Sequence, residues 1–314
     1  MSLMSNKRNS GEMSVAAIDQ IYGKSVARAA RKKRGSLSMS GGERHPGWGS
    51  YVVLVVFILF FLFPFYYAIS IASQDSPSKQ YGVQALIPGG ALFENVATAF
   101  REINFWQALG GTLFVATITS FSTVLFSTLA GFAFAKLRFR GRNGLLTAVI
   151  ATMTIPQQLS VVPLYLLATK AGLYGSLWAV AIPALVSAFG VFWMAQYLQD
   201  ALPYELVEAA RVDGASMIRT FWSIALPAAR PAAAMLFLFT FIGQWTNYFW
   251  PMLILGPNKN SMLTVASSAL KGAHFTDYTL VMSGVLLTTA PLLVLFVIAG
   301  KQLVSGIMAG AVKG

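Results

Sequence analysis

Residues 50–72 read SYVVLVVFILFFLFPFYYAISIA, a stretch that contains no charged side chain. A helix needs about 20 predominantly apolar residues to cross the hydrocarbon core of a bilayer, and this stretch is long enough. It lacks the alternation of apolar and polar residues that a strand of a membrane barrel requires. Because a helix satisfies its own backbone hydrogen bonds in lipid, the stretch predicts a membrane-spanning helix.

The whole chain has the composition of a protein that crosses the membrane several times. Of its 314 residues 56% are hydrophobic and 11% are charged, and the mean hydropathy is +0.62. Soluble globular proteins carry about 25% charged residues, so these values exclude a soluble enzyme. The chain has no cysteine, and its two histidines, His45 and His274, lie far apart. These counts exclude disulfides and thiolate sites, and they disfavour a histidine metal site or a catalytic triad.

Six uncharged stretches meet the length criterion, so we expect an all-α membrane protein with six transmembrane helices. The predicted spans are Ser50–Ala72, Trp106–Ala135, Gly144–Thr169, Ser176–Gln199, Pro231–Leu255 and Thr279–Gly300. None of them contains Asp, Glu, His, Lys or Arg. Carriers coupled to protons or sodium keep such residues at membrane depth, so their absence favours a neutral cargo and an external energy source.

The Lys and Arg residues predict the orientation of the spans. Eighteen of the 23 lie in segments that share one side of the membrane, and five lie in segments on the other side. The first group of segments is 1–49, 136–143, 200–230 and 301–314, and the second group is 73–105, 170–175 and 256–278. Cytoplasmic loops carry the excess of Lys and Arg, so both termini are predicted to be cytoplasmic, flanking a membrane domain over 50–300.

The N-terminal tail is basic, with five Lys or Arg residues between Arg28 and Arg34. One interpretation is attraction to anionic membrane lipid, worth about 1 kcal/mol per charge near the surface. The other, which we favour, is a tail that only enforces topology. The tail has no apolar run long enough for a signal peptide, so we expect no cleavage, and the placement of the charges argues against nucleic acid as a partner.

Prolines and small residues within the spans indicate how the helices bend and pack. Proline removes a backbone hydrogen bond and favours a kink. The prolines in question are Pro64, Pro156, Pro163, Pro183, Pro251 and Pro291. Ser127, Gly131 and Ala135 recur every four residues and form a row that permits close contact with a neighbouring helix. We assign this row to packing.

The segment 200–230 is far longer than a turn between two spans needs to be. Pro203 is placed to start a helix that continues from Tyr204 to Val212, and Asp213-Gly214 is placed to end it. Ser216 is a candidate cap for a second helix that continues through Ile224 and ends at Pro227. Charged residues make the segment amphipathic: Glu205, Glu208, Arg211 and Arg219. It is either a docking element for a soluble partner or simply a solvated helix face.

Residues Glu208–Pro227 read EAARVDGASMIRTFWSIALP. This resembles the EAA loop of ATP-binding-cassette importer permeases, in which Glu-Ala-Ala, a glycine and Ile-x-Leu-Pro recur at fixed spacing. The matching positions, with the acidic residue before the glycine, are Glu208, Ala209, Ala210, Asp213, Gly214, Ile224, Leu226 and Pro227. The segments 155–167, 241–255 and 305–314 likewise resemble MalG-like permeases of sugar importers. One departure is Thr246-Asn247 after Trp245, where the family often has Asn and then an acidic residue.

The resemblance implies a type I importer permease fold and a set of partners. These are a second, MalF-like permease, two ATP-binding subunits, an extracytoplasmic solute-binding protein and a carbohydrate substrate, in a bacterial cytoplasmic membrane. The chain has no Gly-x-x-x-x-Gly-Lys-Ser/Thr loop, so ATP and magnesium are expected in the ATPase, with no cofactor, metal or enzymatic activity in this chain. The loop 204–227 is the implied coupling helix. There Glu208 would pair with a basic residue of the ATPase, and Gly214 would give a reversal that a side chain obstructs.

A sugar pathway needs aromatic faces and neutral hydrogen-bonding groups. The predicted candidates are Gln244, Trp245, Asn247 and Tyr248 in the fifth span, with Gln157 and Gln158 in the third. Gln244, Asn247, Tyr248 and Pro251 follow helical spacing and would form one stripe. Alternatives are hydrogen bonding between helices for the amides and an interfacial belt for Tyr248 and Trp250. Alternative functions are import of a peptide or polyol phosphate, or a membrane scaffold that transports nothing.

Overall fold

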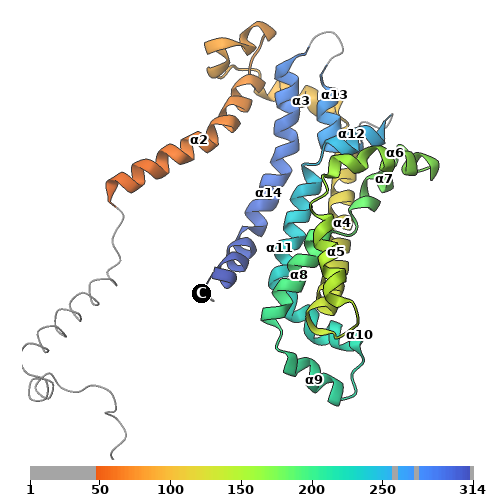
Figure 1. Cartoon of the computed structure of the whole chain (residues 1–314). Helices are drawn as coiled ribbons and strands as arrows, with labels where there is room; N and C mark the ends of the chain where they lie inside the picture. The colour runs from red at the N-terminus through yellow and green to blue at the C-terminus, as the bar shows by residue number, and fades with distance from the viewer. Residues whose placement is uncertain (1–46, 257–260, 272–275, 312–314) are drawn as a thin grey trace, which may run out of the picture. The chain divides into compact units, whose positions relative to one another are not determined.

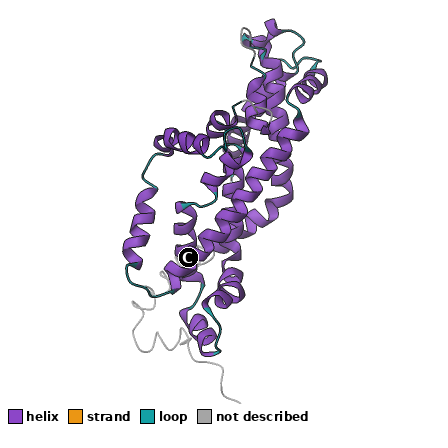
Figure 2. Cartoon of the chain, turned by 90° about the vertical axis from the view of Figure 1, so that its right-hand side faces the viewer, coloured by secondary structure: helices purple, strands orange, loops and turns teal. Residues whose placement is uncertain are grey.

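The structure is a computed structural model that describes residues 47–256, 261–271 and 276–311 (Figure 1). The basic stretch from Arg28 to Arg34 lies outside the described residues, as do the side chains of the C-terminal segment 305–314. The chain divides into two units, 1–62 and 63–314. All secondary structure in the described part of the chain is helical (Figure 2). The expectation of an all-α protein is therefore confirmed for these residues.

The described helices supply the predicted spans. Five helical stretches are long and apolar enough to cross a membrane, and a sixth span is possible if a bent helix pair is counted as one. The five are Trp48–Ala72, Phe105–Lys136, Leu177–Ala201, Met217–Trp245 and Tyr278–Ile298, and the bent pair is 142–152 with 157–170. The protein is thus a multi-pass membrane protein.

The third predicted span, Gly144–Thr169, is not one helix. Helix α5 (Arg142–Thr152) ends before Pro156, and a 3₁₀ turn, η3 (Gln157–Ser160), leads into α6 (Val161–Lys170). The two arms meet at 89°. Pro156 has no N–H to donate and pushes Ile155 away from helical angles, so the chain turns at this point. We call residues 153–160 the elbow.

The fifth predicted span, Pro231–Leu255, is wrong at both ends. Its helix begins at Met217 as α10 (Met217–Thr220), continues through a π-helical turn, η5 (Phe221–Ala225), and becomes α11 (Leu226–Trp245). Pro227 therefore does not end the loop helix. It lies in the first turn of α11, after a widened turn in which the Leu226 amide donates to the Phe221 carbonyl. Because the π turn shifts the hydrogen-bond register, the helix passes the proline without a break.

The fourth span is also interrupted. It comprises α7 (Leu177–Ala181), a 3₁₀ turn, η4 (Ile182–Ala184), and α8 (Ala188–Ala201). Two hydroxyls of α4 (Phe105–Lys136) bond to the carbonyls at this interruption: Ser122 Oγ donates to Leu185 O at 3.0 Å, and Thr123 Oγ1 to Ala184 O at 3.1 Å. The broken backbone is thus satisfied by a neighbouring helix, as the interior of a membrane requires.

Helix α4 packs closely against α8 and α11 at the centre of the unit 63–314. A Cβ on Gly131 would lie 2.7 Å from Met194 Cβ and 2.8 Å from the Ala195 nitrogen. A Cβ on Gly190 would likewise touch Ser127, whose side chain is fully buried. The assignment of the small-residue row to packing is therefore confirmed, because only glycine lets these two backbones approach so closely.

The remaining helices pack around α11 and near the ends of α4. Helix α14 (Tyr278–Ala311) contacts α3 (Leu92–Glu102), α11 and α13 (Leu263–Ala269). Near its start, Gln80 Nε2 donates to Asp277 Oδ1 at 2.7 Å, and the Tyr278 amide donates to Gln80 Oε1 at 3.0 Å. These bonds fix the segment that precedes α3 to the beginning of α14.

Candidate functional site

The loop between α8 and α11 forms the helix–turn–helix that its sequence predicts. Helix α9 (Tyr204–Val212) ends at Gly214, which has a φ of +77°. The Ala215 amide donates to Ala210 O at 2.8 Å, and the Gly214 amide to Arg211 O at 3.0 Å. This is the Schellman arrangement, which satisfies carbonyls at a helix end. Ser216 Oγ then accepts from the Arg219 amide at 3.2 Å and caps α10, as predicted.

Helix α9 has one face packed against the protein and one face free. Val207 and Ala210 are buried, and Val207 packs in a cluster with Leu202 and Phe221. The other face presents Leu206, Glu208, Ala209 and Val212, and Val212 is 88% exposed. Glu208 makes no ion pair with any residue that the structure describes. The free face of α9 therefore carries exposed apolar residues, Leu206 and Val212, beside the charged Glu208.

The reason for a glycine at position 214 differs from the expected one. A Cβ there would meet nothing within 4 Å, so a side chain does not obstruct the turn within this chain. The constraint is the positive φ, which costs an L-residue roughly 1–2 kcal/mol. The remaining positions of the motif, Ile224, Leu226 and Pro227, are half-buried, and Ile224 and Leu226 pack against the same cluster as α9. They attach the loop to α11.

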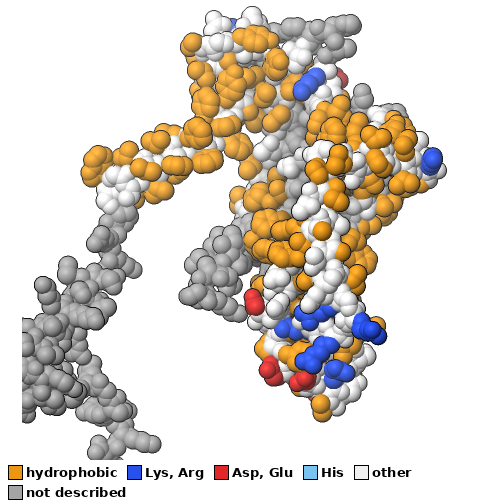
Figure 3. All heavy atoms as spheres, viewed as in Figure 1, with side chains coloured by type: hydrophobic (Ala, Val, Ile, Leu, Met, Phe, Trp, Pro, Cys, Tyr) orange, Lys and Arg blue, Asp and Glu red, His pale blue; other side chains and the backbone are white. Residues whose placement is uncertain are grey.

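Charged side chains gather around this loop (Figure 3). The neighbouring α4–α5 connection is rich in arginine, and the loop itself carries acidic and basic residues. They are Lys136, Arg138, Arg140 and Arg142 on the first segment, and Glu205, Glu208, Arg211, Asp213 and Arg219 on the second. The spans leading away from this end are apolar, so the charged side chains are concentrated at the end that carries the loop.

A second candidate site is a cavity of about 740 Å³ between the elbow, the interruption of the fourth span, and the end of α11. Four predicted pathway residues line it: Gln157, Gln158, Gln244 and Asn247. Trp250 of α12 (Phe249–Leu255) also lines it. The structure thus brings together residues of the third and fifth spans that are far apart in sequence. We call this space the polar cavity.

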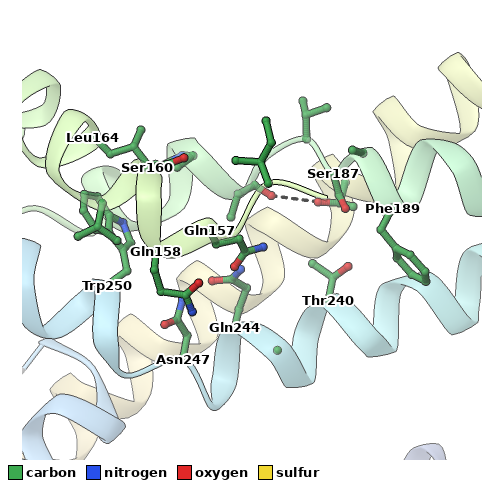
Figure 4. Close-up of a pocket in the computed structure, with 18 of the residues that line it drawn as sticks. Gln157, Gln158, Ser160, Leu164, Ser187, Phe189, Thr240, Gln244, Asn247 and Trp250 are labelled. Carbon is green, nitrogen blue, oxygen red and sulfur yellow. Dashed lines mark hydrogen bonds between the residues drawn. The ribbon is translucent and has the colours of Figure 1, made fainter. Parts of the chain in front are cut away.

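The four amides of the polar cavity converge from two sides (Figure 4). Gln157 and Gln158 come from the 3₁₀ turn after Pro156, Gln244 comes from the end of α11, and Asn247 comes from the loop that follows it. Gln244 Oε1 is buried and has no hydrogen-bond partner among the residues that the structure describes. A buried acceptor without a partner costs about 1–3 kcal/mol, so this oxygen is available to accept a hydrogen bond from a molecule that occupies the cavity.

The predicted helical stripe in the fifth span is wrong. Helix α11 ends at Trp245, residues 246–248 are not helical, and α12 begins at Phe249. The break is held from outside, because Thr264 Oγ1 donates to Asn247 O at 2.9 Å. Asn247 therefore reaches the cavity from a loop.

Two predicted pathway residues do not line the polar cavity. Trp245 is 1% exposed, and its Nε1 donates to Thr288 O of α14 at 3.1 Å, which assigns it to helix packing. Tyr248 is exposed and lies outside the cavity lining. Pro251 is buried in α12. Trp245, the last residue of α11, faces α14. The helix breaks after it, so the residues that follow do not continue the same helical face.

Sequence reasoning missed the hydroxyls of the cavity, which come from Thr123, Thr152, Ser160, Ser187 and Thr240. Thr240 could have been identified from the sequence, because it lies one helical turn before Gln244 on the same face of the helix. None of the lining residues that the structure describes is charged, and the aromatic ones are Phe189, Phe249 and Trp250. The lining offers neutral donors, neutral acceptors and aromatic faces.

Comparison with known proteins places these features in a family. Residues 123–308 match the family described as "Binding-protein-dependent transport system inner membrane component". The chain is 32% identical over 271 residues to the lactose transport system permease protein LacG of Rhizobium radiobacter, covering 86% of this chain and 98% of LacG. It is 29% identical over 267 residues to the sn-glycerol-3-phosphate transport system permease protein UgpE of Shigella flexneri, covering 82% and 95%.

The fold is similar to a chain in the crystal structure of a bacterial ABC transporter involved in the import of the acidic polysaccharide alginate. The TM-score is 0.68 at 24% sequence identity, covering 81% of this chain and 95% of the other. At this level of sequence identity the similarity supports the fold alone.

Proposed function

Since this chain belongs to the family of binding-protein-dependent transport system inner membrane components, we propose that it is the permease subunit of an ATP-binding-cassette importer for a carbohydrate. Within that class we propose a di- or oligosaccharide, which the similarity to LacG favours. The observation that carries the substrate class is the uncharged lining of the polar cavity.

That lining suits a sugar for chemical reasons. Sugar hydroxyls both donate and accept hydrogen bonds, and so do the amides of Gln157, Gln158, Gln244 and Asn247. The C–H faces of a sugar ring are apolar and are matched by aromatic side chains such as Phe189 and Trp250. A pathway must hold its cargo weakly, and neutral hydrogen bonds of about 0.5–1.5 kcal/mol each meet that requirement.

A polyol phosphate is the main competing substrate, because UgpE is named for sn-glycerol 3-phosphate. Phosphate carries up to two negative charges and is normally bound by Arg, Lys or a helix N-terminus. No Lys or Arg is among the described residues that line the polar cavity. The N-terminus of α8, which lies in the lining, is already capped by Ser187 Oγ, which accepts from the Gly190 amide at 3.2 Å. A peptide, with its charged termini, would face the same lack of counter-charges. The neutral sugar is therefore the better match.

A second permease subunit is proposed as the partner that covers the elbow. All ten residues from Ala151 to Ser160 are exposed, and the backbone from Met153 to Ser160 is not α-helical. Non-helical backbone at membrane depth is tolerated only where protein buries it or where it lines a water-filled cavity. A partner of the same fold would complete the wall of the polar cavity on this side and form the other half of the pathway.

The exposed face of α9 is proposed as the docking surface for one of two ATP-binding subunits, which hold ATP and magnesium. Its support is the match of the EAA motif, together with the exposure of Glu208 and Val212. With this docking we propose that the loop and both termini lie in the cytoplasm of a bacterial cell, and that a solute-binding protein docks at the opposite face. ATP binding would then move α9 and, through α11, turn the polar cavity from one side of the membrane to the other.

The test uses the complete transporter, with both permeases, the ATPase and the binding protein of the same system, reconstituted in lipid vesicles. We expect ATP-dependent uptake of a labelled disaccharide or short oligosaccharide and none of glycerol 3-phosphate, with vesicles lacking ATP as the control. Uptake of glycerol 3-phosphate or a peptide instead would refute the substrate class. A chain that purifies without an ATPase and supports no uptake would identify it as a scaffold.

A further inference from the structure

The indole N–H of Trp250 is tied to the backbone of a neighbouring span. Its Nε1 donates to the carbonyl oxygen of Ala179 in α7 at 3.1 Å, and Ala179 is 2% exposed. A second backbone bond lies close by, from the Gly175 amide to Ile254 O at 2.8 Å. Helix α12 is therefore held at Trp250 against α7 and at Ile254 against Gly175, which lies just before α7.

The carbonyl of Ala179 is available because of Pro183. In a continuous α-helix this carbonyl would accept from the amide of residue 183, but proline has no N–H. The helix tightens into the 3₁₀ turn η4 at this point. The buried carbonyl would be left without its usual donor, a state that costs about 1–3 kcal/mol. The Trp250 indole supplies the missing donor.

This bond decides which part of Trp250 remains for a ligand. The half-buried ring packs against a cluster that includes Val180 and Ile254, and it also lines the polar cavity. With Nε1 occupied by Ala179, the indole has no other donor. Figure 4 shows Trp250 at the same end of the cavity as Gln158 and Asn247. The aromatic face of Trp250 and the amides thus offer complementary contacts.

We propose that Pro183, acting through the Ala179 carbonyl, is a positioning residue that holds the Trp250 ring as the stacking surface for the apolar face of a sugar ring. This inference rests on the proposed carbohydrate function. The ring contacts the sugar, and the amides of Gln158 and Asn247 bond its hydroxyls. The arrangement selects a ring that presents a C–H face over an acyclic polyol, which has no such face.

Two other tryptophans make a similar bond to a backbone carbonyl, but no proline lies four residues after the carbonyl that they bond. Trp193 Nε1 donates to Ala232 O at 3.2 Å, and Trp245 Nε1 donates to Thr288 O at 3.1 Å. The residues four positions after these acceptors are Leu236 and Leu292, which have their own N–H groups. Those carbonyls keep helical donors, and neither tryptophan lines the polar cavity. Removing either indole would break the same kind of side-chain bond, but the carbonyl would keep the amide of its own helix as a donor. These tryptophans are therefore suitable controls.

The test is a double-mutant cycle with Pro183→Ala and Trp250→Phe in the reconstituted transporter. With proline at 183, Trp250→Phe leaves the Ala179 carbonyl unsatisfied and should lower the melting temperature of the complex. In the Pro183→Ala background the new amide supplies a donor, so the same change should lower the melting temperature less. Each single variant should reduce the sugar imported per ATP hydrolysed by about two- to tenfold, and the double variant should be no worse.

Matched controls are Trp193→Phe and Pro163→Ala, the latter in the first turn of α6, and both should keep wild-type import per ATP. Additive melting temperatures would refute the bond between the two sites. Coupled melting temperatures with unchanged import per ATP would refute the positioning role while leaving the bond intact. A wild-type complex that imports no carbohydrate would refute the proposed function, whereas the thermal cycle would still report on the bond.

Discussion

The guanidinium carbon of Arg138 lies 5.2 Å from the centroid of the Tyr204 ring. Arg138 follows the end of α4, and Tyr204 is the first residue of α9. Nearby, Lys136 Nζ donates to Gln199 O near the end of α8 at 2.9 Å. The first contact joins the connection after α4 to the start of the proposed coupling helix, and the second joins the ends of α4 and α8 to each other. A displacement of α9 would therefore be passed to α4 and α8 as well as to α11.

Replacing Arg138 tests this connection. Arg138→Ala should reduce substrate-stimulated ATP hydrolysis by the reconstituted transporter, while the complex loses only about 0.5–1 kcal/mol of stability. Arg138→Lys keeps the charge but loses the planar group that stacks on the ring, so it should restore activity in part. Tyr204→Phe keeps the ring and serves as the control. Full stimulation in Arg138→Ala would show that the contact plays no part in coupling.

Two glycines of α4 should respond in opposite ways to alanine. Gly131→Ala places a Cβ 2.7 Å from Met194 Cβ and should destabilise the protein by about 1–3 kcal/mol through overpacking. Gly110→Ala meets nothing within 4 Å and should stabilise the helix by up to about 1 kcal/mol. Thermal unfolding of the purified complex measures both. Equal effects at the two positions would contradict the close approach of α4 and α8.

The positive φ of Gly214 predicts that different substitutions at this position destabilise the protein to different extents. Gly214→Ala should cost roughly 1–2 kcal/mol, because φ is +77°, whereas Gly214→Asn should cost less, since asparagine tolerates this region. Gly214→Asp should behave like Gly214→Asn in stability, yet weaken ATPase docking through its charge. Hydrogen exchange of α9 and co-purification of the ATPase separate the two effects. Loss of α9 protection in all three variants would instead point to a steric role.

The unpartnered amide oxygen of Gln244 predicts opposite changes in stability and transport. Gln244→Met removes a buried acceptor that has no partner in the described part of the chain, so the melting temperature should stay constant or rise. Sugar import per ATP should fall several-fold if the amide serves the cargo. Thr246→Val is the control, because Thr246 Oγ1 bonds back to Ile242 O of α11 and Thr246 does not line the cavity. A lower melting temperature with normal import would assign Gln244 to structure.

Topology is testable with single cysteines, because the natural chain has none. Cysteines introduced at Arg140 and Ser216 should react with a membrane-impermeant maleimide only after the membrane is permeabilised. A cysteine at Gly90 should react in intact spheroplasts. Reaction of Ser216→Cys from the outside would place the α9 loop on the wrong side for ATP and refute the proposed coupling.

The loop between α8 and α11 shows why part of this protein could be predicted from sequence. The end of α9 at Gly214 and the cap at Ser216 are set by hydrogen bonds between residues at most five positions apart. The positions of the spans follow from runs of apolar residues that lipid accepts and water does not. Such features depend on near neighbours or on the solvent, so the amino-acid order alone determines them.

The polar cavity depends on contacts that the amino-acid order does not reveal. Trp245 and Trp250 look equivalent in sequence, yet one faces α14 and the other faces the cavity because the helix breaks between them. That break is held by Thr264, and the elbow at Pro156 brings Gln157 and Gln158 toward Gln244. The apolar runs of the sequence assign these amides to predicted spans. Only the packing of α7, α11 and α12 decided which side chains meet, because each break is stabilised by groups distant in the chain.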